Sequence, residues 1–514
     1  MKNVWIIDFG SQYTQLITRK SRELGYSSEI MTLGDCFKKL GKGELPVAFI
    51  LSGGPNSIFE DTTDYSKIFD LNLPLLGICY GMQLVSNHFD GVVERGMQGE
   101  YGHSKVHGVG GYSIPGVKTS FNTWMSHFDH VKVVPPGFTQ ILESDNGLIA
   151  GIENPAKKIM ALQFHPEVEH TEHGKDILLH FFKDIANLTQ TWSNEVMLEN
   201  CRTEILEVRG SKVLCAFSGG VDSLVAATIA HEVLGDDLYC FFVDNGLLRP
   251  QDYHHIEVLK KETQLNIEVI DAKELFLSKL AGESEPEKKR KIIGGTFIEV
   301  FEQKVHEFEK DHQIKFEYLL QGTLYPDVIE SVSPHKKGGK SVVIKSHHNV
   351  GGLPERMKLK LLEPLKFLFK DEVRVLGEAV NLKYEWVHRH PFPGPGIGIR
   401  ILGEIFPESV RKVQESDQIL FEELKEQNLY QACWQAFTVL LPVKTVGIKG
   451  DTRAYEEVMC IRIVNSTDGM TATWSHLPFE FLAKASARMT NEVAGITRVV
   501  YDITSKPPGT IEWE

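Results

Sequence analysis

The stretch LLGICYGMQL, residues 75–84, combines an expected buried strand, a sharp turn and the start of a helix. Cys79 stands at the turn, with Gly77 and Gly81 two positions away on either side. Glycines at these positions relieve crowding, so that the side chain between them stands exposed above the end of the strand. The N-terminus of the following helix favours thiolate, the reactive form of cysteine. The pattern predicts a cysteine nucleophile on an α/β sheet, with the amide of Tyr80 directed into an oxyanion hole.

A histidine and a glutamate later in the chain are candidate partners for this cysteine. In FHPE, residues 164–167, His165 and Glu167 lie two positions apart at the end of an expected strand. Because strand side chains repeat every two residues, both point to one face, where Glu167 can orient His165 as a base. The Gly-rich turn SGGP at 52–55 follows another expected strand and offers a second oxyanion donor. One buried cysteine and one histidine alone would indicate nothing, whereas the combined pattern is specific.

The segments GICYGMQ, SGGP and FHPE, in this order and spacing, resemble the triad-type (class I) glutamine amidotransferases over roughly residues 1–190. The resemblance implies that Cys79 forms a glutamyl thioester, that His165 shuttles protons and that Glu167 orients His165. It implies that the amides of Gly54 and Tyr80 line the oxyanion hole and that Gln83 helps to hold the glutamine. The segment MSHFD at 125–129 would be a loop that faces the substrate.

Short apolar runs alternate with helical patterns, which predicts two consecutive α/β domains with mostly parallel sheets, followed by a small α+β domain. We expect these domains at 1–190, 195–389 and 390–514, with the polar stretch 187–194 as a linker and Ser475 as a helix N-cap. Expected strands are 4–8, 47–51, 73–78, 158–164, 212–220 (running into a Gly turn), 238–246, 267–271, 316–322, 456–464 and 498–503; expected helices are 12–24, 80–89, 174–186, 221–234 and 478–491.

Composition excludes several classes of function. The 514 residues carry a net charge of −14, which opposes broad binding to nucleic acid. No apolar run approaches the roughly 18 residues that span a membrane, and the N-terminus lacks a signal-peptide layout, so we expect a cytoplasmic protein without membrane contact. Seven scattered cysteines, with no Cys-x-x-Cys pair, fit neither a disulfide framework nor a zinc site. Basic clusters at 288–291 and 336–340 are expected to meet a small anionic ligand.

The segment SGGVDS, residues 218–223, lies between an expected strand and an expected helix. Its small residues let backbone amides close on a phosphate, and the helix dipole adds to the attraction. It resembles the pyrophosphate loop of ATP pyrophosphatases, which adenylate a substrate oxygen and release pyrophosphate, and this implies ATP with Mg²⁺ held by Asp222. The candidate ATP-binding residues are Ser218, Gly219, Gly220, Val221, Asp222, Ser223 and Val243, with Asp327 and Lys345 as further supports.

Four longer strings resemble the GMP synthetase family along the whole chain: QGTLYPDVIES at 321–331, KSHHNVGGLP at 345–354, RHPFPGPG at 389–396 and KPPGTIEWE at 506–514. The resemblance implies glutamine, ATP and XMP as substrates, and a homodimer formed through the C-terminal domain. Ammonia released from glutamine would displace AMP from adenylated XMP. The residues expected to bind XMP are Arg290, Gln435, Arg498, Lys506, Ile511 and Glu512.

Other interpretations stay open at this point. An enzyme resembling NAD synthetase would use the same kind of loop to amidate a different substrate, and a tRNA thiolase would show basic arms and paired cysteines. A regulatory nucleotide-binding protein would have lost Cys79, His165 or Asp222, all of which are present.

Overall fold

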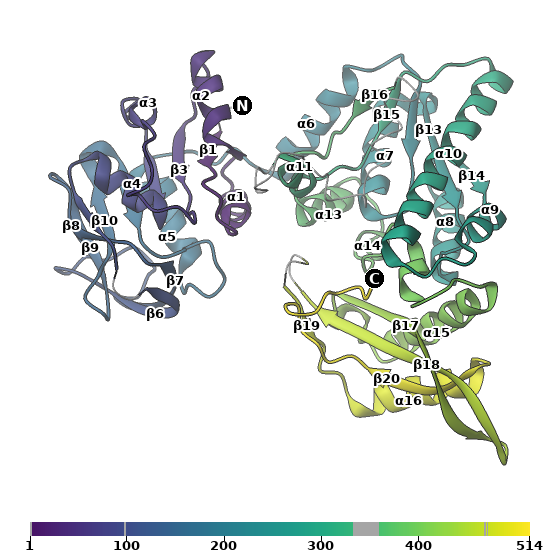
Figure 1. Ribbon diagram of the computed structural model, residues 1–514. Helices are drawn as coiled ribbons and strands as arrows, with labels where there is room; N and C mark the ends of the chain where they lie inside the picture. Colours follow the sequence, from purple (N-terminus) through teal and green to yellow (C-terminus); the bar gives the residue numbers. More distant parts are fainter. Residues whose placement is uncertain (1–2, 97–98, 333–358, 467–468, 470) are drawn as a thin grey trace. The chain divides into compact units, whose positions relative to one another are not determined.

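The computed structural model in Figure 1 describes residues 3–96, 99–332, 359–466, 469 and 471–514. Within these residues the chain forms two compact units, with the change from one to the other between Met197 and Leu198. None of the described helices combines the length and the apolar character that a membrane crossing requires. The basic cluster at 336–340, the string at 345–354 and Lys345 lie outside the described residues.

The first unit is built on a nine-stranded sheet in the order β2-β1-β3-β4-β11-β10-β9-β6-β7. Neighbouring strands run parallel from β2 to β11 and antiparallel from β11 to β7. The antiparallel half was not expected from the sequence. The strands are β1 (Val4–Ile7), β2 (Ser28–Met31), β3 (Ala48–Leu51), β4 (Leu75–Ile78), β6 (Glu100–Gly108), β7 (Ser120–His127), β9 (Thr139–Ser144), β10 (Ile149–Asn154) and β11 (Ile159–Leu162), with β5 (Val92–Glu94) and β8 (His130–Val133) paired separately.

Helices cover both faces of the parallel half. Side chains of β1 alternate between two cores: Val4 and Ile6 pack with α1 and α5, whereas Trp5 and Ile7 pack with α2 and α4. This alternation is the expected consequence of the two-residue repeat of a strand. The helices are α1 (Thr14–Glu23), α2 (Leu33–Gly41), α3 (Ser66–Phe69), α4 (Tyr80–His88) and α5 (Gly174–His180), which continues as a π-helical turn, Phe181–Ile185.

The second unit begins with a five-stranded sheet in the order β14-β13-β12-β15-β16, in which every pairing is parallel. The predicted fold class, α/β sheets followed by an α+β part, is therefore confirmed. The strands are β12 (Val213–Ala216), β13 (Leu238–Asp244), β14 (Ile267–Asp271), β15 (Tyr318–Leu320) and β16 (Lys360–Leu362), and the helices are α6 (Asn194–Leu206), α7 (Val221–Leu234), α8 (Pro250–Glu262), α9 (Lys273–Leu280), α10 (Pro286–His312), α11 (Tyr325–Val332), α13 (Lys370–Ala379) and α14 (Tyr384–Val387).

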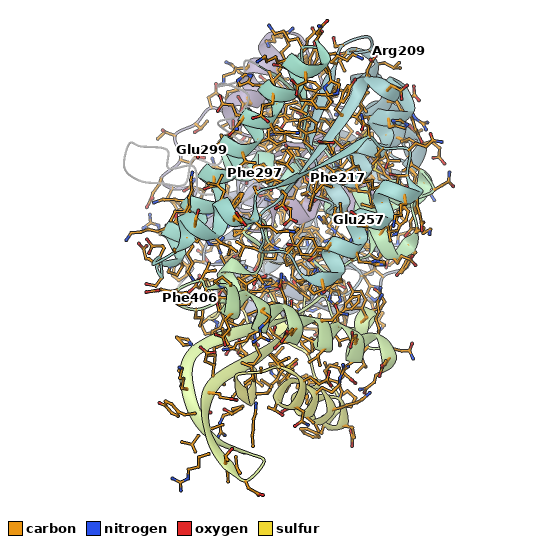
Figure 2. The ribbon with its side chains drawn as sticks, turned by 90° about the vertical axis from the view of Figure 1, so that its right-hand side faces the viewer. Arg209, Phe217, Glu257, Phe297, Glu299 and Phe406 are labelled. Atoms are coloured by element: carbon orange, nitrogen blue, oxygen red, sulfur yellow. The ribbon has the colours of Figure 1, made fainter. Side chains whose placement is uncertain are left out.

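The C-terminal part is a helix-covered sheet with one long hairpin. Strand β18 pairs antiparallel with β17 and β19 and parallel with β20. Figures 1 and 2 show the β17–β18 hairpin reaching away from α15, which follows the labelled Phe406. The elements are α15 (Pro407–Glu426), β17 (Gln435–Lys449), β18 (Thr452–Asn465), β19 (Thr473–Trp474), α16 (Phe479–Glu492) and β20 (Ile496–Tyr501).

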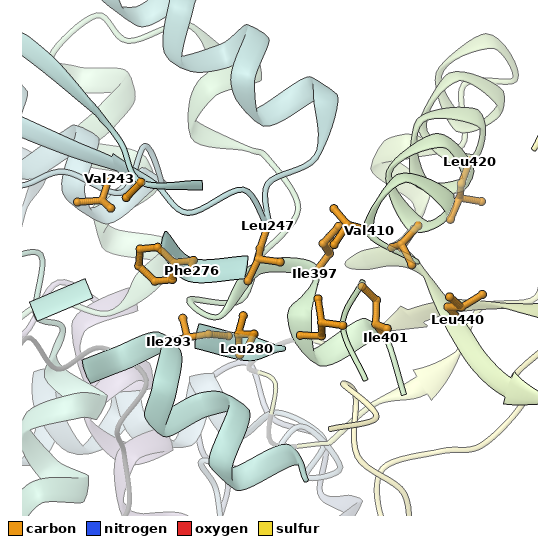
Figure 3. Packing of buried hydrophobic residues seen from close by; sticks show 14 of the residues in the cluster. Val243, Leu247, Phe276, Leu280, Ile293, Ile397, Ile401, Val410, Leu420 and Leu440 are labelled. Carbon is orange, nitrogen blue, oxygen red and sulfur yellow. The ribbon is translucent and has the colours of Figure 1, made fainter. Parts of the chain in front are cut away.

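One apolar core joins the parallel-sheet part of the second unit to its C-terminal part. Figure 3 shows Leu247 and Ile293 from the parallel-sheet part beside Ile397 and Ile401, and the same cluster continues to Leu440 of β17. The expected domain boundary between 389 and 390 thus lies inside a single compact unit, and it stays a prediction.

Two local expectations were wrong. The helix near 478–491 begins at Phe479 with Pro478 at its N-cap, not Ser475. The amide of Ser475 instead donates to Ile463 O at 2.9 Å, so the chain is still extended there. The stretch 187–194 is not a free linker, because the amides of Thr191 and Trp192 donate to Gly25 O at 2.8 and 2.9 Å.

Candidate active sites

Cys79 occupies a strained turn directly after β4. Its φ of +53° lies in a region that residues other than glycine rarely adopt. A Cβ at Gly77 would lie 2.7 Å from the main chain of Gly81, and one at Gly81 would lie 2.3 Å from Leu51 O. The two flanking glycines are therefore required by close backbone approach, as the sequence pattern predicts, but the Cys79 side chain is buried and not exposed as expected.

His165 and Glu167 form a buried pair next to this turn. His165 Nδ1 and Glu167 Oε1 are 2.7 Å apart, and both side chains are almost fully buried. Burial alone would lower the pKa of His165, but the negative charge of Glu167 and the neighbouring Cys79 outweigh it and raise this pKa well above its usual value. The ring is thus held as a proton carrier beside the thiol.

The SGGP turn brings its first glycine between these groups. A Cβ placed on Gly53 would lie 2.9 Å from His165 Cε1 and 3.6 Å from Cys79 Cβ. Any side chain at this position would therefore enter the space between nucleophile and base. The neighbouring Gly54 packs just as closely on Phe9, whose carbonyl oxygen would lie 2.7 Å from its Cβ.

The MSHFD segment, expected as a loop, is the end of β7 followed by Phe128 and Asp129, and it closes the site on another side. Cys79 Sγ lies 3.6 Å from Ser126 O, and Gln83 Nε2 donates to Asp129 O at 2.9 Å. One end of the Gln83 amide is therefore committed to the loop, which leaves its oxygen for other contacts. A buried pair, His127 Nε2 and Glu100 Oε2 at 3.0 Å, braces the same loop from β6.

Sequence reasoning missed Tyr13 and Trp124. The ring of Tyr13 stands edge-on to His165 at 4.9 Å between ring centroids, and its hydroxyl accepts a hydrogen bond from Trp124 Nε1 at 3.2 Å. Tyr13 falls within the stretch 12–24 expected as a helix, and Trp124 in a strand that was not expected, so neither gave a functional signal.

The SGGVDS loop of the second unit is folded around its own hydroxyl groups. Ser218 Oγ and Ser223 Oγ are 3.0 Å apart, and Gly220 N donates to Ser218 Oγ at 3.3 Å. Gly219 has a φ of +72°, a conformation that favours glycine. With α7 beginning at Val221, the loop presents a helix N-terminus of the kind that binds phosphate.

Asp222 in this loop is paired with a lysine that the sequence did not single out. Lys370 Nζ, at the start of α13, lies 2.5 Å from Asp222 Oδ2, while Asp222 Oδ1 is buried without a hydrogen-bond partner. Of the other expected ATP residues, Val243 is buried in the apolar core, and Asp327 accepts the amide of Leu324 at 3.0 Å.

Two of the expected XMP residues meet at a buried arginine. Arg400, which is fully buried, donates to Glu512 Oε1 at 2.9 Å and Oε2 at 3.2 Å. Gln435 Nε2 donates to the same Glu512 Oε1 at 2.9 Å. The Arg400 guanidinium is also stacked over Phe437 at 4.1 Å. Arg400 was missed because a lone arginine in sequence gives no sign of its burial.

The remaining expected XMP residues are more scattered. Lys506 Nζ donates to Gly469 O at 2.8 Å, the Ile511 side chain is part of an apolar core, and Arg290 donates to Glu514 O. Arg498 is exposed on β20, where its Nε lies 3.4 Å from Thr445 Oγ1 on the hairpin. Gln435 contacts Glu512, whereas Arg498 contacts Thr445 on the hairpin, so among the described residues Arg498 does not join that cluster.

A second missed arginine holds the C-terminal segment that carries these residues. Arg462, fully buried on β18, donates to Thr504 O at 2.5 Å and Thr510 O at 3.0 Å, and pairs with Asp502 at 3.2 Å. One side chain thereby satisfies carbonyl groups on both arms of a segment that has little regular structure of its own.

The chain thus combines a Cys–His–Glu group on an α/β sheet with a separate glycine-rich loop before a helix, and its segments match families of both kinds. Residues 5–185 match the family described as glutamine amidotransferase class-I, residues 212–317 the phosphoadenosine phosphosulfate reductase domain, and residues 422–513 the GMP synthase C terminal domain.

Curated relatives match the whole chain. It is 50% identical to the GMP synthase [glutamine-hydrolyzing] of Chlorobium phaeovibrioides, over 100% of both chains, and 51% identical to that of Helicobacter acinonychis, over 99% of both. The relative from Helicobacter pylori strain J99 is 52% identical over 99% of this chain and 100% of its own. The chain belongs to the family of glutamine-hydrolysing GMP synthases.

The raised pKa of His165 predicts a pH-dependent contribution to stability. A group whose pKa is higher in the folded than in the unfolded state stabilises the fold fully below its unfolded value, about 6.5 for histidine. This stabilising contribution is lost as the pH rises through the raised pKa of His165 in the folded protein. Glu167→Gln removes the charge that raises it, so the melting-temperature deficit of the variant should be largest below about pH 6.5 and shrink at alkaline pH.

Differential scanning fluorimetry across this range tests the prediction. Glu169→Gln, at a highly exposed neighbouring carboxylate, serves as the matched control and should leave the melting temperature almost unchanged. A deficit for Glu167→Gln that grows with pH would contradict the assignment.

Proposed function

We propose that this protein makes GMP by joining two half-reactions, the release of ammonia from glutamine in the first unit and the ATP-dependent amidation of XMP in the second. The observation that carries the proposal is the presence in one chain of the Cys79–His165–Glu167 group and the SGGVDS loop. Amidation by the NAD synthetase-like alternative would use the same loop, but the full-length relatives are named GMP synthases.

In the first half-reaction, the Cys79 thiolate attacks the side-chain carbonyl carbon of glutamine. The C–N bond breaks, the leaving nitrogen takes a proton from His165 and departs as ammonia, and a glutamyl thioester remains. Water, deprotonated by His165, then cleaves the thioester to glutamate. Glu167 keeps His165 in the orientation that both steps need and stabilises the protonated ring that forms between them, through the 2.7 Å contact at Nδ1.

The oxyanion that develops on the glutamine carbonyl needs hydrogen-bond donors already in place. The amides of Gly54 and Tyr80 are the proposed donors, one from the SGGP turn and one from the first residue of α4. Gln83 contributes by holding the MSHFD loop against the site through Asp129 O, and its amide oxygen is available to the substrate.

In the second half-reaction, a carbonyl oxygen of XMP attacks the α-phosphorus of ATP and pyrophosphate leaves. Ammonia then adds to the activated carbon and AMP departs, which leaves the amino group of GMP. The SGGVDS loop binds the pyrophosphate through its amides and the hydroxyl groups of Ser218 and Ser223. Main-chain groups near Val243, rather than its buried side chain, are proposed to contact the nucleoside of ATP.

We propose Mg²⁺ as the cofactor that accompanies ATP. Magnesium is usually held by one or two carboxylates together with substrate phosphates, and Asp222 Oδ1 is a buried carboxylate oxygen without a partner at the loop. When bound, the ion would neutralise charge on the phosphates. Among the described residues, no three His, Cys, Asp or Glu side chains gather in a way that could hold a metal without the nucleotide.

Binding of XMP is proposed at Arg290, Gln435, Arg498, Lys506, Ile511 and Glu512. The carboxylate of Glu512 is fixed and its charge balanced by Arg400, so it can accept from a sugar hydroxyl without strongly repelling the phosphate of the substrate. The main chain of Ile511 and the cation of Lys506 lie on the segment held by Arg462. Arg498 is the least supported member, because it lies against Thr445.

We further propose a cytoplasmic homodimer that assembles through the C-terminal part. The seven cysteines are all free, as expected in a reducing compartment. The β17–β18 hairpin exposes Val443, Val446, Ile448 and Tyr455, and a second copy of the chain would cover them.

Separating the two half-reactions tests the main proposal. Cys79→Ala should abolish GMP synthesis from glutamine, because the nucleophile is lost, while synthesis from added ammonium chloride stays within about twofold of wild type. The measurement is GMP and pyrophosphate formed from XMP, ATP and Mg²⁺ with either nitrogen source. Formation of no GMP by the wild-type protein, or loss of both routes in Cys79→Ala, would contradict the proposal.

Lys370 should matter for both nitrogen sources. Lys370→Met removes the cation beside Asp222 and the phosphate loop, so synthesis from glutamine and from ammonia should both fall by about ten- to a hundredfold. Lys366→Met is the matched control, since Lys366 Nζ pairs with Glu204 of α6 at 2.8 Å and not with Asp222. Unchanged ammonia-driven synthesis in Lys370→Met would exclude this role.

The dimer proposal predicts a change in mass. Ile448 is 78% exposed, so Ile448→Glu should leave the fold intact while placing a charge in the proposed interface, which converts dimer to monomer in sedimentation velocity experiments. Leu45→Glu, at an exposed apolar residue of the first unit (57% exposed), is the control for the added charge. A wild-type protein that sediments as a monomer at micromolar concentration would refute the proposal.

A further inference from the structure

Behind the proposed oxyanion hole, three side chains connect its two halves: Phe9, Asp61 and Tyr65, which we call the clamp. The ring of Phe9 stands edge-on to Tyr80 at 5.4 Å and to Tyr65 at 5.9 Å between centroids. On its other side Phe9 is in close contact with Gly54, where a Cβ would meet Phe9 O at 2.7 Å. The two residues that carry the proposed oxyanion donors therefore both pack against Phe9, Tyr80 on its ring and Gly54 on its main chain and Cβ.

Asp61 makes the polar contacts of the clamp. Its Oδ2 accepts hydrogen bonds from Tyr65 Oη and Tyr80 Oη, both at 2.5 Å, and its Oδ1 accepts from Thr63 N at 2.8 Å. Asp61 belongs to the segment between β3 and α3 that continues from the SGGP turn, whereas Tyr80 is the residue after Cys79. One carboxylate thus ties the segment of one donor to the helix that carries the other.

Packing alone does not fix the Tyr65 ring. A cavity of about 140 Å³ lies beside the clamp, lined by Asp61, Tyr65 and His88 among others. Tyr65 borders open space on that side, so its position depends on the hydrogen bond to Asp61 more than on close contacts. Burial would raise the pKa of Asp61, but the hydrogen bonds from Tyr65, Tyr80 and Thr63 lower it to about 2, so the acceptor stays ionised at neutral pH.

We propose that Asp61 is a positioning residue for glutamine hydrolysis, which sets the spacing between the Gly54 and Tyr80 amides by holding the Tyr80 ring against Phe9 and the SGGP segment. This inference rests on the proposed roles of these two amides. It assigns Asp61 no contact with glutamine: the clamp acts on the oxyanion that develops during attack, because preorganised donors stabilise the transition state more than the bound substrate.

The inference separates two reactions of the same thiolate. Hydrolysis of glutamine passes through an oxyanion, whereas alkylation of Cys79 by iodoacetamide forms an S–C bond with loss of iodide and needs no oxyanion hole. Asp61→Ala and Tyr80→Phe should therefore lower the kcat for glutamine at least about tenfold, a fraction of the 10²–10³-fold that losing a donor outright costs. The KM for glutamine should change less than about threefold.

In the same variants, alkylation of Cys79, followed by mass spectrometry of its peptide, should keep its rate within about twofold, and ammonia-driven GMP synthesis should be unchanged. Tyr112→Phe is the matched control, since it removes another tyrosine–carboxylate hydrogen bond of the first unit, Tyr112 Oη to Glu153 Oε2 at 2.6 Å, away from the clamp. It should leave the kcat near wild type.

Three results would overturn the inference: an unchanged kcat in Asp61→Ala, alkylation that slows as much as turnover, or an equal loss of kcat in Tyr112→Phe. The first removes any role for Asp61, and the other two reduce it to general support of the fold. None of them touches the proposed function, which stands or falls with Cys79→Ala.

Discussion

The arrangement of the strands around the first site depends on the strained backbone conformation of Cys79. A non-glycine residue at a φ of +53° costs about 1–3 kcal/mol and persists only where its surroundings compensate. The Cys79 amide donates to Leu162 O at 2.7 Å, and the main chain of α4 approaches Leu51 so closely that Gly81 cannot carry a side chain. Strands β3, β4 and β11 must therefore lie side by side before the turn can form.

The same pairing places the partners of Cys79. Because Leu162 of β11 lies opposite Ile78 of β4 in a parallel register, the residues that follow each strand emerge at one edge of the sheet. FHPE follows β11 and Cys79 follows β4, so nucleophile and base meet without any sequence proximity. Glu167 then offsets the cost of burying a charged His165, which turns a buried ring into a proton carrier.

In the second unit, charged side chains are buried in a core that excludes water. Arg400 and Arg462 are fully buried, and each is surrounded by carboxylates, carbonyl groups or aromatic faces that replace water. Removing one partner would leave an uncompensated charge, so these networks also fix the shape of the C-terminal segment. The Glu512 carboxylate is therefore positioned by Arg400 from within the core.

The sequence by itself determined what depends on neighbours along the chain: the glycines around Cys79, the fold of SGGVDS before α7, and most strands of the parallel sheets. It did not indicate β6, β7, β9 and β10, or the role of Pro478 in place of Ser475. Only the tertiary structure decided which distant residues meet. Lys370 and Asp222 form an ion pair although they are 148 positions apart, and Tyr80 donates a hydrogen bond to Asp61, 19 positions before it. Local sequence patterns reflect steric requirements and the periodicity of strands and helices. Contacts between distant residues depend on strand order and burial, which a short stretch of sequence does not encode.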